Sequence, residues 1–271
     1  MARILKLDVN DTADVLVVQE VKKRTWWTLI MADNWCSNGM GLQRQLSSRQ
    51  PALDLPIDEG IFQSLCGSEI PNSLPKTKLG LWAHNMTLVA ILGPIHDLNW
   101  KLVDGKLAES DSDQLVNDIT GRLDAWLASL PEEMRLTDEN LDSYARRGSG
   151  GTFVALHLGY HHYATLLYFQ YLDVRRSRTT AKELYHTRCK SHASNYSRLL
   201  AQSRSKANCE AVYATVGHMT VVSSSVLLHM LLFGREEELE EARQNLTSNF
   251  AALIELRQLW PSLERVVCRI A

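Results

Sequence analysis

His157 and His161 stand four residues apart, the spacing at which two side chains face the same way from a helix. Metal ligands on helices use this spacing, but no glutamate follows His157 as in the His-Glu-x-x-His arrangement, and no third ligand can be named. The sequence therefore predicts no metal site. Both histidines and Tyr160 remain catalytic candidates, because such side chains can donate a hydrogen bond to a carbonyl group. The alternative is that the histidines are structural and pack near the core.

The sequence holds no other recognisable arrangement of nucleophile, cofactor-binding or redox residues. Ser149 lies in Gly148-Ser149-Gly150-Gly151, but no strand is predicted before it to form a nucleophile elbow. Neither a Walker-type loop nor a dinucleotide fingerprint occurs. The five cysteines are scattered without a Cys-x-x-Cys pair, so neither a zinc cluster nor a redox motif can be drawn. We therefore predict no cofactor.

Aromatic residues gather on a predicted helix near the start of the sequence. Over residues 12–36, Trp27, Ile30 and Trp35 recur at helical spacing, and Trp26 belongs to a second apolar row. A helix that is apolar over so wide an arc is expected to be buried on several sides. An interior lined by such rings either packs as a filled core or holds a hydrophobic ligand in a cavity. The ligand-binding candidates are Trp26, Trp27, Trp35, Trp82, His157, Tyr160 and His161.

The rest of the sequence alternates between helical patterns and loops, which predicts an all-α fold. Only residues 14–18 alternate as a strand would. We predict one compact multi-helix domain over residues 1–271. Apart from the tryptophan-rich helix, the predicted helices cover residues 81–92, 113–130, 152–174, a segment starting at Thr180, residues 211–233 and residues 236–259.

Several helix ends are predicted from local signals. Gly93-Pro94 is expected to kink or end the helix that precedes it, and residues 131–151 are expected to form a surface loop. Thr180 begins a capping-box pattern. Gly234 is expected to end the helix before it, because glycine tolerates the left-handed conformation.

Residues 211–233 contain no Asp, Glu, Lys or Arg and are long enough to cross a bilayer. His218, Thr220 and the run Ser223-Ser224-Ser225 lower the hydrophobicity of this segment. A core helix of an all-α domain has the same pattern. We therefore predict a buried helix and no membrane contact.

The charge and composition point to an intracellular protein that does not contact nucleic acid directly. The formal net charge is -2, whereas phosphate contacts would need an excess of basic residues. An odd number of unpatterned cysteines suits a reducing compartment, the cytoplasm or the nucleus. Charged residues interrupt any apolar run near Met1, so no signal peptide is predicted.

Several separated motifs give the sequence a resemblance to a known family. The first motif consists of Glu20, Arg24, Trp26, Trp27, Asp33, Gly41, Asp54 and Pro56, and the later ones lie at residues 123–131, 156–161 and 250–261. In this order they resemble the middle homology, or regulatory, domain of fungal binuclear zinc-cluster transcription factors, over about residues 18–265. The chain departs from the family pattern at Gly41-Leu42-Gln43, in place of a Gly-Arg-Pro-type turn, and at Gln170-Tyr171, where an Arg-Pro is frequent.

The resemblance also indicates what this sequence lacks. Family members carry, upstream, six zinc-binding cysteines, a basic DNA-reading segment and the first half of the helical domain. This sequence opens just before the Trp-Trp helix. We therefore expect a helical body without its own DNA-binding module.

Three classes of function are compatible with these features. The first is a regulatory or binding module that acts through a small hydrophobic ligand, a protein partner or a homo-oligomer. The second is an enzyme recruited from the same scaffold, such as a cofactor-free cyclase or cycloaddition catalyst of fungal secondary metabolism, which folds an apolar substrate by proximity and orientation. The third is a truncated or mispredicted gene product.

Overall fold

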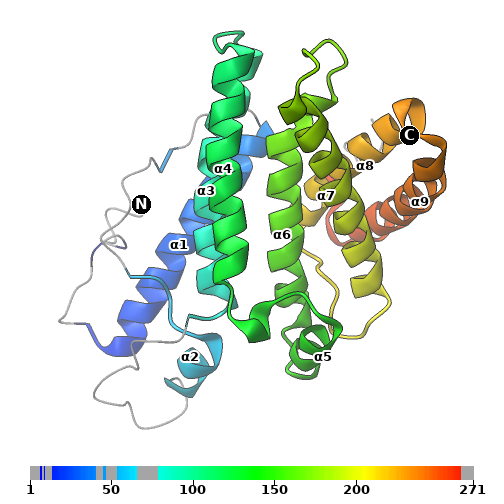
Figure 1. Cartoon of the computed structure of the whole chain (residues 1–271). Helices are drawn as coiled ribbons and strands as arrows, with labels where there is room; N and C mark the ends of the chain where they lie inside the picture. The colour runs from blue at the N-terminus through cyan, green and yellow to red at the C-terminus, as the bar shows by residue number, and fades with distance from the viewer. Residues whose placement is uncertain are drawn as a thin grey trace. The chain divides into compact units, whose positions relative to one another are not determined.

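The computed structural model of the chain describes residues 7, 9, 14–40, 45–46, 54–65 and 79–263. Every regular element in this part is helical and none is a strand, which confirms the predicted all-α fold. Within residues 14–18, which alternate like a strand, residues 16–18 instead form the start of the first helix. Along the chain the elements are α1 (Leu16–Met40), α2 (Glu59–Leu65), α3 (Leu81–Val103), α4 (Glu109–Ser129), η1 (Glu132–Met134), α5 (Asp138–Arg146), α6 (Gly150–Tyr168), η2 (Phe169–Leu172), α7 (Thr180–Arg204), α8 (Ala214–Phe233), α9 (Glu236–Leu259) and η3 (Pro261–Leu263) (Figure 1).

The chain divides into two compact units, residues 1–93 and residues 94–271. The first contains α1, α2 and the beginning of α3, and the second contains the elements from the end of α3 to η3. That residues 1–271 form one domain stays a prediction.

The helix α3 continues through Gly93-Pro94, so of the expected kink or end at this position the end is wrong, and the kink stays a prediction. Proline has no backbone N–H and costs a helix interior roughly 3 kcal/mol. The residues around it are apolar and almost fully buried, and their burial offsets that cost. The buried neighbours are Leu92, Ile95 and Leu98.

Residues 131–151 contain η1 and α5 rather than only a surface loop. Thr137 is the N-cap of α5, and its side chain accepts a hydrogen bond from the Asn140 backbone N–H. The side chain of Asn140 donates to the carbonyl groups of Glu132 and Arg135. Capping and local polar bonds therefore begin this short helix, and its buried residues Leu141, Tyr144 and Ala145 recur at helical spacing.

Two other helix ends differ in detail from the sequence predictions. The N-cap of α7 is Thr179, not Thr180, and its side chain accepts from the Lys182 N–H at 3.1 Å. Gly234 ends α8 in an extended conformation with φ −77°, not in the left-handed one. A Cβ atom there would lie 2.3 Å from the Met230 carbonyl oxygen, so close approach, not positive φ, requires glycine.

In the second unit α6 lies between α4 and α7 and also packs against α5 and α8 (Figure 1). Its N-terminus is closed by the loop before α8. A Cβ on Gly150 would lie 2.4 Å from the Asn208 carbonyl oxygen, and one on Gly151 would lie 2.5 Å from that of Glu210. Gly150 and Gly151 of the Gly-Ser-Gly-Gly segment therefore serve close backbone packing.

The uncharged helix α8 is held by polar contacts to α7 and α9. The Tyr196 hydroxyl bonds to that of Thr220 at 3.0 Å, and Ser197 bonds to Ser223 at 2.9 Å. Asn249 of α9 donates to Ser224 at 3.1 Å. Within the described residues α8 is the one helix long and apolar enough to cross a membrane, and half of its most apolar window is buried. Its paired hydroxyl groups are those of a helix inside a bundle.

Candidate functional site

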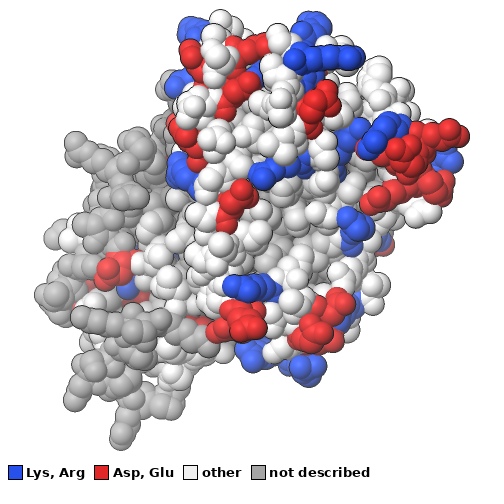
Figure 2. Space-filling model, viewed as in Figure 1, with Lys and Arg blue, Asp and Glu red and all other residues white. Residues whose placement is uncertain are grey.

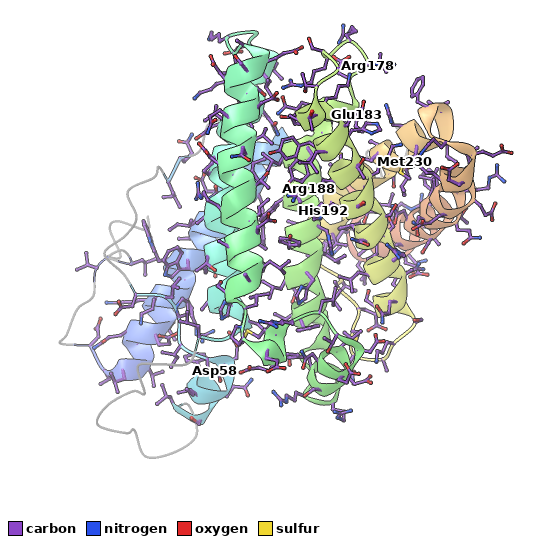
Figure 3. The ribbon with its side chains drawn as sticks, viewed as in Figure 1. Asp58, Arg178, Glu183, Arg188, His192 and Met230 are labelled. Atoms are coloured by element: carbon purple, nitrogen blue, oxygen red, sulfur yellow. The ribbon has the colours of Figure 1, made fainter. Side chains whose placement is uncertain are left out.

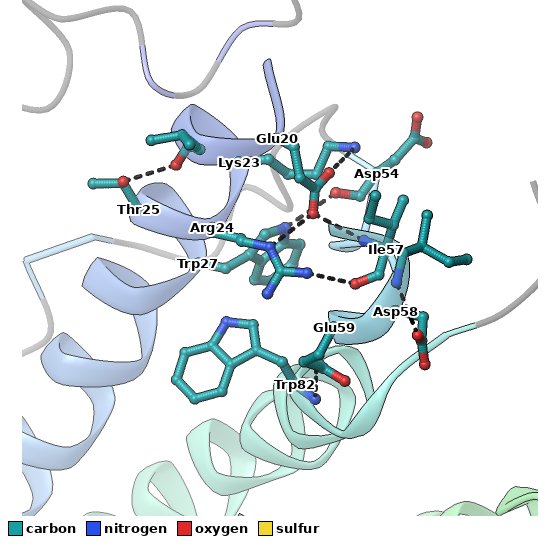
Figure 4. A network of polar contacts seen from close by, with 12 residues as sticks. Glu20, Lys23, Arg24, Thr25, Trp27, Asp54, Ile57, Asp58, Glu59 and Trp82 are labelled. Atoms are coloured by element: carbon teal, nitrogen blue, oxygen red, sulfur yellow. Dashed lines mark hydrogen bonds and ion pairs between the residues drawn. The ribbon is translucent and has the colours of Figure 1, made fainter. Parts of the chain in front are cut away.

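Residues that carry the family resemblance meet where α1 contacts residues 54–58 (Figure 4). The Glu20 carboxylate Oε1 accepts from Arg24 Nε at 3.0 Å and from the Ile57 backbone N–H at 2.9 Å. Arg24 Nη2 donates to the Ile57 carbonyl at 2.6 Å. Trp27 Nε1 donates to the Asp54 carbonyl at 3.2 Å. We call Glu20, Arg24, Trp27, Asp54 and Ile57 the α1 clamp, because they hold an extended segment against the helix.

The carboxylate at the centre of the α1 clamp is compensated by two cations. Glu20 is only 1% exposed, and Lys23 Nζ lies 3.3 Å from its second oxygen. Arg24 also covers the Phe62 ring, with its guanidinium carbon 4.4 Å from the ring centre. A buried carboxylate is tolerated only when charge and hydrogen bonds replace its water. The geometry therefore marks this cluster as a structural joint.

Other acidic side chains near the α1 clamp cap backbone N–H groups. Asp33 accepts from the N–H groups of Gln45 at 3.0 Å and Leu46 at 2.9 Å. Glu59 accepts from the N–H groups of Leu81 and Trp82 at the start of α3, at 3.1 and 3.0 Å. A carboxylate at a helix N-terminus satisfies free donors and complements the helix dipole. Gly41 of the same motif lies outside the described residues.

The four candidate tryptophans all lie in the first unit. Trp26 is 7% exposed and packs with Leu7, Ile30 and Leu46, while its indole N–H has no hydrogen-bond partner among the residues that the structure describes. Trp27 belongs to the α1 clamp. Trp35 and Trp82 are half-buried. The structure therefore gives Trp26 and Trp27 packing and clamping contacts, and their role in ligand binding stays a prediction.

His157, Tyr160 and His161 lie together on α6 in the second unit, but they have different partners. His157 is 1% exposed, and its Nε2 lies 3.0 Å from the Met134 carbonyl oxygen. Its ring also contacts Phe153 edge-on. His157 therefore anchors η1 to α6. Tyr160 is buried and stacks on Trp126 of α4, with ring centres 5.8 Å apart.

His161 faces a second histidine, His192 of α7. Their Nδ1 atoms are 3.0 Å apart, so one ring donates the hydrogen bond and the other accepts it. The Tyr160 ring contacts both imidazoles, at 5.3 and 5.6 Å between centres. Figure 3 labels His192 and Arg188, on the part of α7 beside α6. Sequence reasoning missed His192 as a partner, because it stands 31 residues from His161 on another helix.

Burial keeps this group of side chains uncharged at neutral pH. Desolvation lowers the pKa of His157 to about 4, and that of His192 to about 4. Desolvation, with the facing His192 as a smaller cause, lowers the pKa of His161 to about 3. Desolvation and then the charge of Asp124 raise the pKa of Tyr160 to about 12. The arrangement offers neutral imidazoles and a protonated phenol, which can exchange or donate hydrogen bonds.

Ring contacts continue from this pair along α6 and α7. Tyr168 lies 5.9 Å from His192 and stacks on Tyr185 at 5.2 Å, and Tyr185 contacts Tyr171 at 4.9 Å. The Tyr171 hydroxyl donates to Asp113 at 2.6 Å. Here the aromatic interior is filled by rings that touch one another. In the described part of the chain, no group of three or more His, Cys, Asp or Glu side chains could hold a metal ion.

Two hollows in the second unit lie away from the predicted site residues. One is an open, polar depression at η1 and α5, lined among others by Glu132, Arg135 and Asn140. The other is an apolar cavity beside the ends of α7 and α9. Neither is lined by any of the seven predicted ligand-binding residues.

Comparison with known proteins relates the chain to a transcriptional regulator. It is similar to a protein of Schizosaccharomyces pombe described as an uncharacterized transcriptional regulatory protein, with 25% identity over 166 residues. The alignment covers 53% of this chain and 16% of that protein, so the chain spans about a sixth of its relative's length. No protein-family model matches the chain, and no solved structure matches it. The likeness supports a transcription-regulator-like relationship.

Proposed function

We propose that this chain is a regulatory helical domain of the type found in fungal zinc-cluster transcription factors. It would act inside the cell, in the nucleus or cytoplasm, through a small hydrophobic ligand or a protein partner. One contact pattern supports the proposal. Of the residues by which the sequence resembles that family, Glu20, Arg24, Trp27 and Asp54 meet in one joint, the α1 clamp, as expected of residues that define a scaffold. The relationship to a transcriptional regulatory protein agrees with it.

Direct reading of DNA by this domain is not part of the proposal. On the face drawn in Figure 2, basic and acidic side chains are interspersed. The formal net charge of the chain is -2. Affinity for nucleic acid rests on phosphate neutralisation by a basic surface. We propose that DNA contact is supplied by a partner or by another part of a longer protein.

The test is a transcription reporter in which the full chain is fused to a heterologous DNA-binding domain. We expect reporter output to change several-fold relative to the DNA-binding domain alone. Arg24→Ala, which breaks the α1 clamp, should abolish the change, whereas Lys22→Ala, whose ion pair with Asp14 is half-exposed, should preserve it. Reporter output equal to that of the DNA-binding domain alone would reject the proposed function.

A second candidate function is a cofactor-free cyclase or cycloaddition catalyst. The observation that favours it is the neutral His161–His192 pair beside the protonated Tyr160, which can donate a hydrogen bond to a substrate carbonyl group. Gene deletion with parallel metabolite and transcript profiling separates the two functions. Loss of a product with unaltered transcripts, reproduced by Tyr160→Phe, is expected for catalysis. Lowered transcripts of other genes are expected for regulation and would count against the enzyme.

A further inference from the structure

A preformed apolar cavity lies in the second unit, lined by residues from the ends of α7 and α9 and from the segment between α7 and α8. Its volume is about 220 Å³. Leu200, Ala252 and Leu256 form a buried floor. Val212 and Leu259 stand at the mouth with 46% and 58% of their surfaces exposed. Exposed apolar side chains around a hollow with a buried apolar floor are typical of a ligand site.

Two chain segments beside this cavity are joined by a hydrogen bond. Trp260, directly after α9, donates its indole N–H to the Val212 carbonyl oxygen at 2.7 Å. This bond fixes the loop before α8 to the end of α9. A preformed cavity spares a ligand the cost of ordering its site.

The volume limits the size of the occupant. A cavity of about 150 Å³ accommodates benzene, and pockets for drug-sized ligands begin near 300 Å³. A hollow of about 220 Å³ therefore suits a body of one or two rings.

The charges at the rim select the sign of the ligand. The charge of Arg204 is already paired, because its Nε donates to Glu255 at 2.9 Å and its Nη2 pairs with the other Glu255 oxygen, while its Nη1 donates to the Ser248 carbonyl. Glu210 also lines the cavity and is exposed. Among the described residues no ion pair neutralises Glu210, so the rim carries one excess negative charge. A carboxylate ligand would be repelled by the charge of Glu210, and Arg204 is already paired with Glu255.

We propose that this cavity binds a small organic amine, with an apolar body of one or two rings on the Leu200–Ala252–Leu256 floor and its ammonium group facing Glu210. The inference deepens the proposed function, because it names a chemical class for the small ligand of the regulatory domain. Binding itself can be measured on the full chain without any transcriptional response.

The experiment uses three probes of similar size and different charge: 2-phenylethylamine, 2-phenylethanol and 3-phenylpropionate. By calorimetric titration, we expect the amine to bind about fivefold tighter than the alcohol, the ratio given by a rim ion pair, and the carboxylate to bind weakest. When the amine is added, the NMR signals of the Trp260 backbone amide and indole N–H groups should shift. Glu210→Gln should bring amine and alcohol to equal affinity.

Variants that fill the cavity test whether the probes bind inside it. Ala252→Phe fills the floor and should abolish binding of amine and alcohol, whereas Ile254→Phe on the exposed side of α9 should leave it unchanged. Since a large ring at a buried position can disturb packing, Val212→Trp at the mouth provides a second block. Absence of binding for all three probes, equal affinity of amine and alcohol in the unmodified chain, or an unchanged ratio in Glu210→Gln would overturn the inference.

The two proposals fail in different ways. Amine binding together with a silent reporter fusion would reject the regulatory function and leave the cavity assignment standing. An active reporter fusion without binding of any probe would reject the cavity assignment alone.

Discussion

Acidification from pH 7 to pH 5 is expected to lower the free energy of unfolding of the second unit by about 3–5 kcal/mol through three buried histidines. These are His157, His161 and His192, whose pKa values desolvation lowers to about 4, 3 and 4. A loss of this size is comparable to the whole stability of many domains.

The sign follows from which state binds the protons. In the unfolded chain these imidazoles take up protons as the pH falls through about 6.5, while in the folded chain they stay neutral until near pH 4. The contribution of the neutral histidines to the free energy of unfolding is therefore fully present above pH 6.5 and is lost as the pH falls toward 4. Among the charged groups around the pair, Arg188 opposes protonation of His192 and Asp124 favours it. Arg198 opposes protonation of His161.

Urea unfolding of the full chain at a series of pH values measures this effect. The slope of the unfolding free energy against pH is proportional to the number of protons taken up on unfolding. Replacing the facing pair, His161→Phe with His192→Phe, should lower that number by about two near pH 5.5. His157→Gln should reduce it by about one. An unchanged slope in the double variant would contradict the assignment, whatever the variant's absolute stability.

Arg24→Ala is expected to lower the local stability of the first unit by about 2–3 kcal/mol. The substitution leaves the buried Glu20 carboxylate without its main cation and frees the Ile57 carbonyl group. It also removes the guanidinium from the Phe62 ring. Breaking a buried ion pair by removing one partner costs more than the pair contributes, because a buried charge is left behind.

Hydrogen exchange of the Ile57 amide is the local readout, since this N–H donates directly to Glu20. Its protection should fall about a hundredfold in Arg24→Ala. Lys22→Ala, which removes a half-exposed ion pair to Asp14, should change it by less than about fivefold. Equal protection in the two variants would show that Glu20 and Arg24 do not hold residues 54–58 to α1.

Three long helices were predictable from sequence to within a few residues. α9 was predicted over the range that it occupies, and α4 and α8 differ by at most four residues at either end. The helix through Pro94 and the short α5 were not predictable in this way. In the first case buried neighbours override a local helix breaker. In the second the apolar face consists of only three buried residues, Leu141, Tyr144 and Ala145, within a polar segment.

The candidate site shows the same division. The sequence alone determined which residues recur at helical spacing, the absence of a metal-binding motif, and a resemblance carried by Glu20, Arg24 and Trp27. Only the tertiary structure decided that Glu20 and Arg24 bond to the Ile57 backbone and that His161 faces His192. It also decided that none of the predicted site residues lines the apolar cavity. Spacing along one helix fixes which side chains share a face. Partners from a different helix depend on how the helices pack, and no local pattern contains that information.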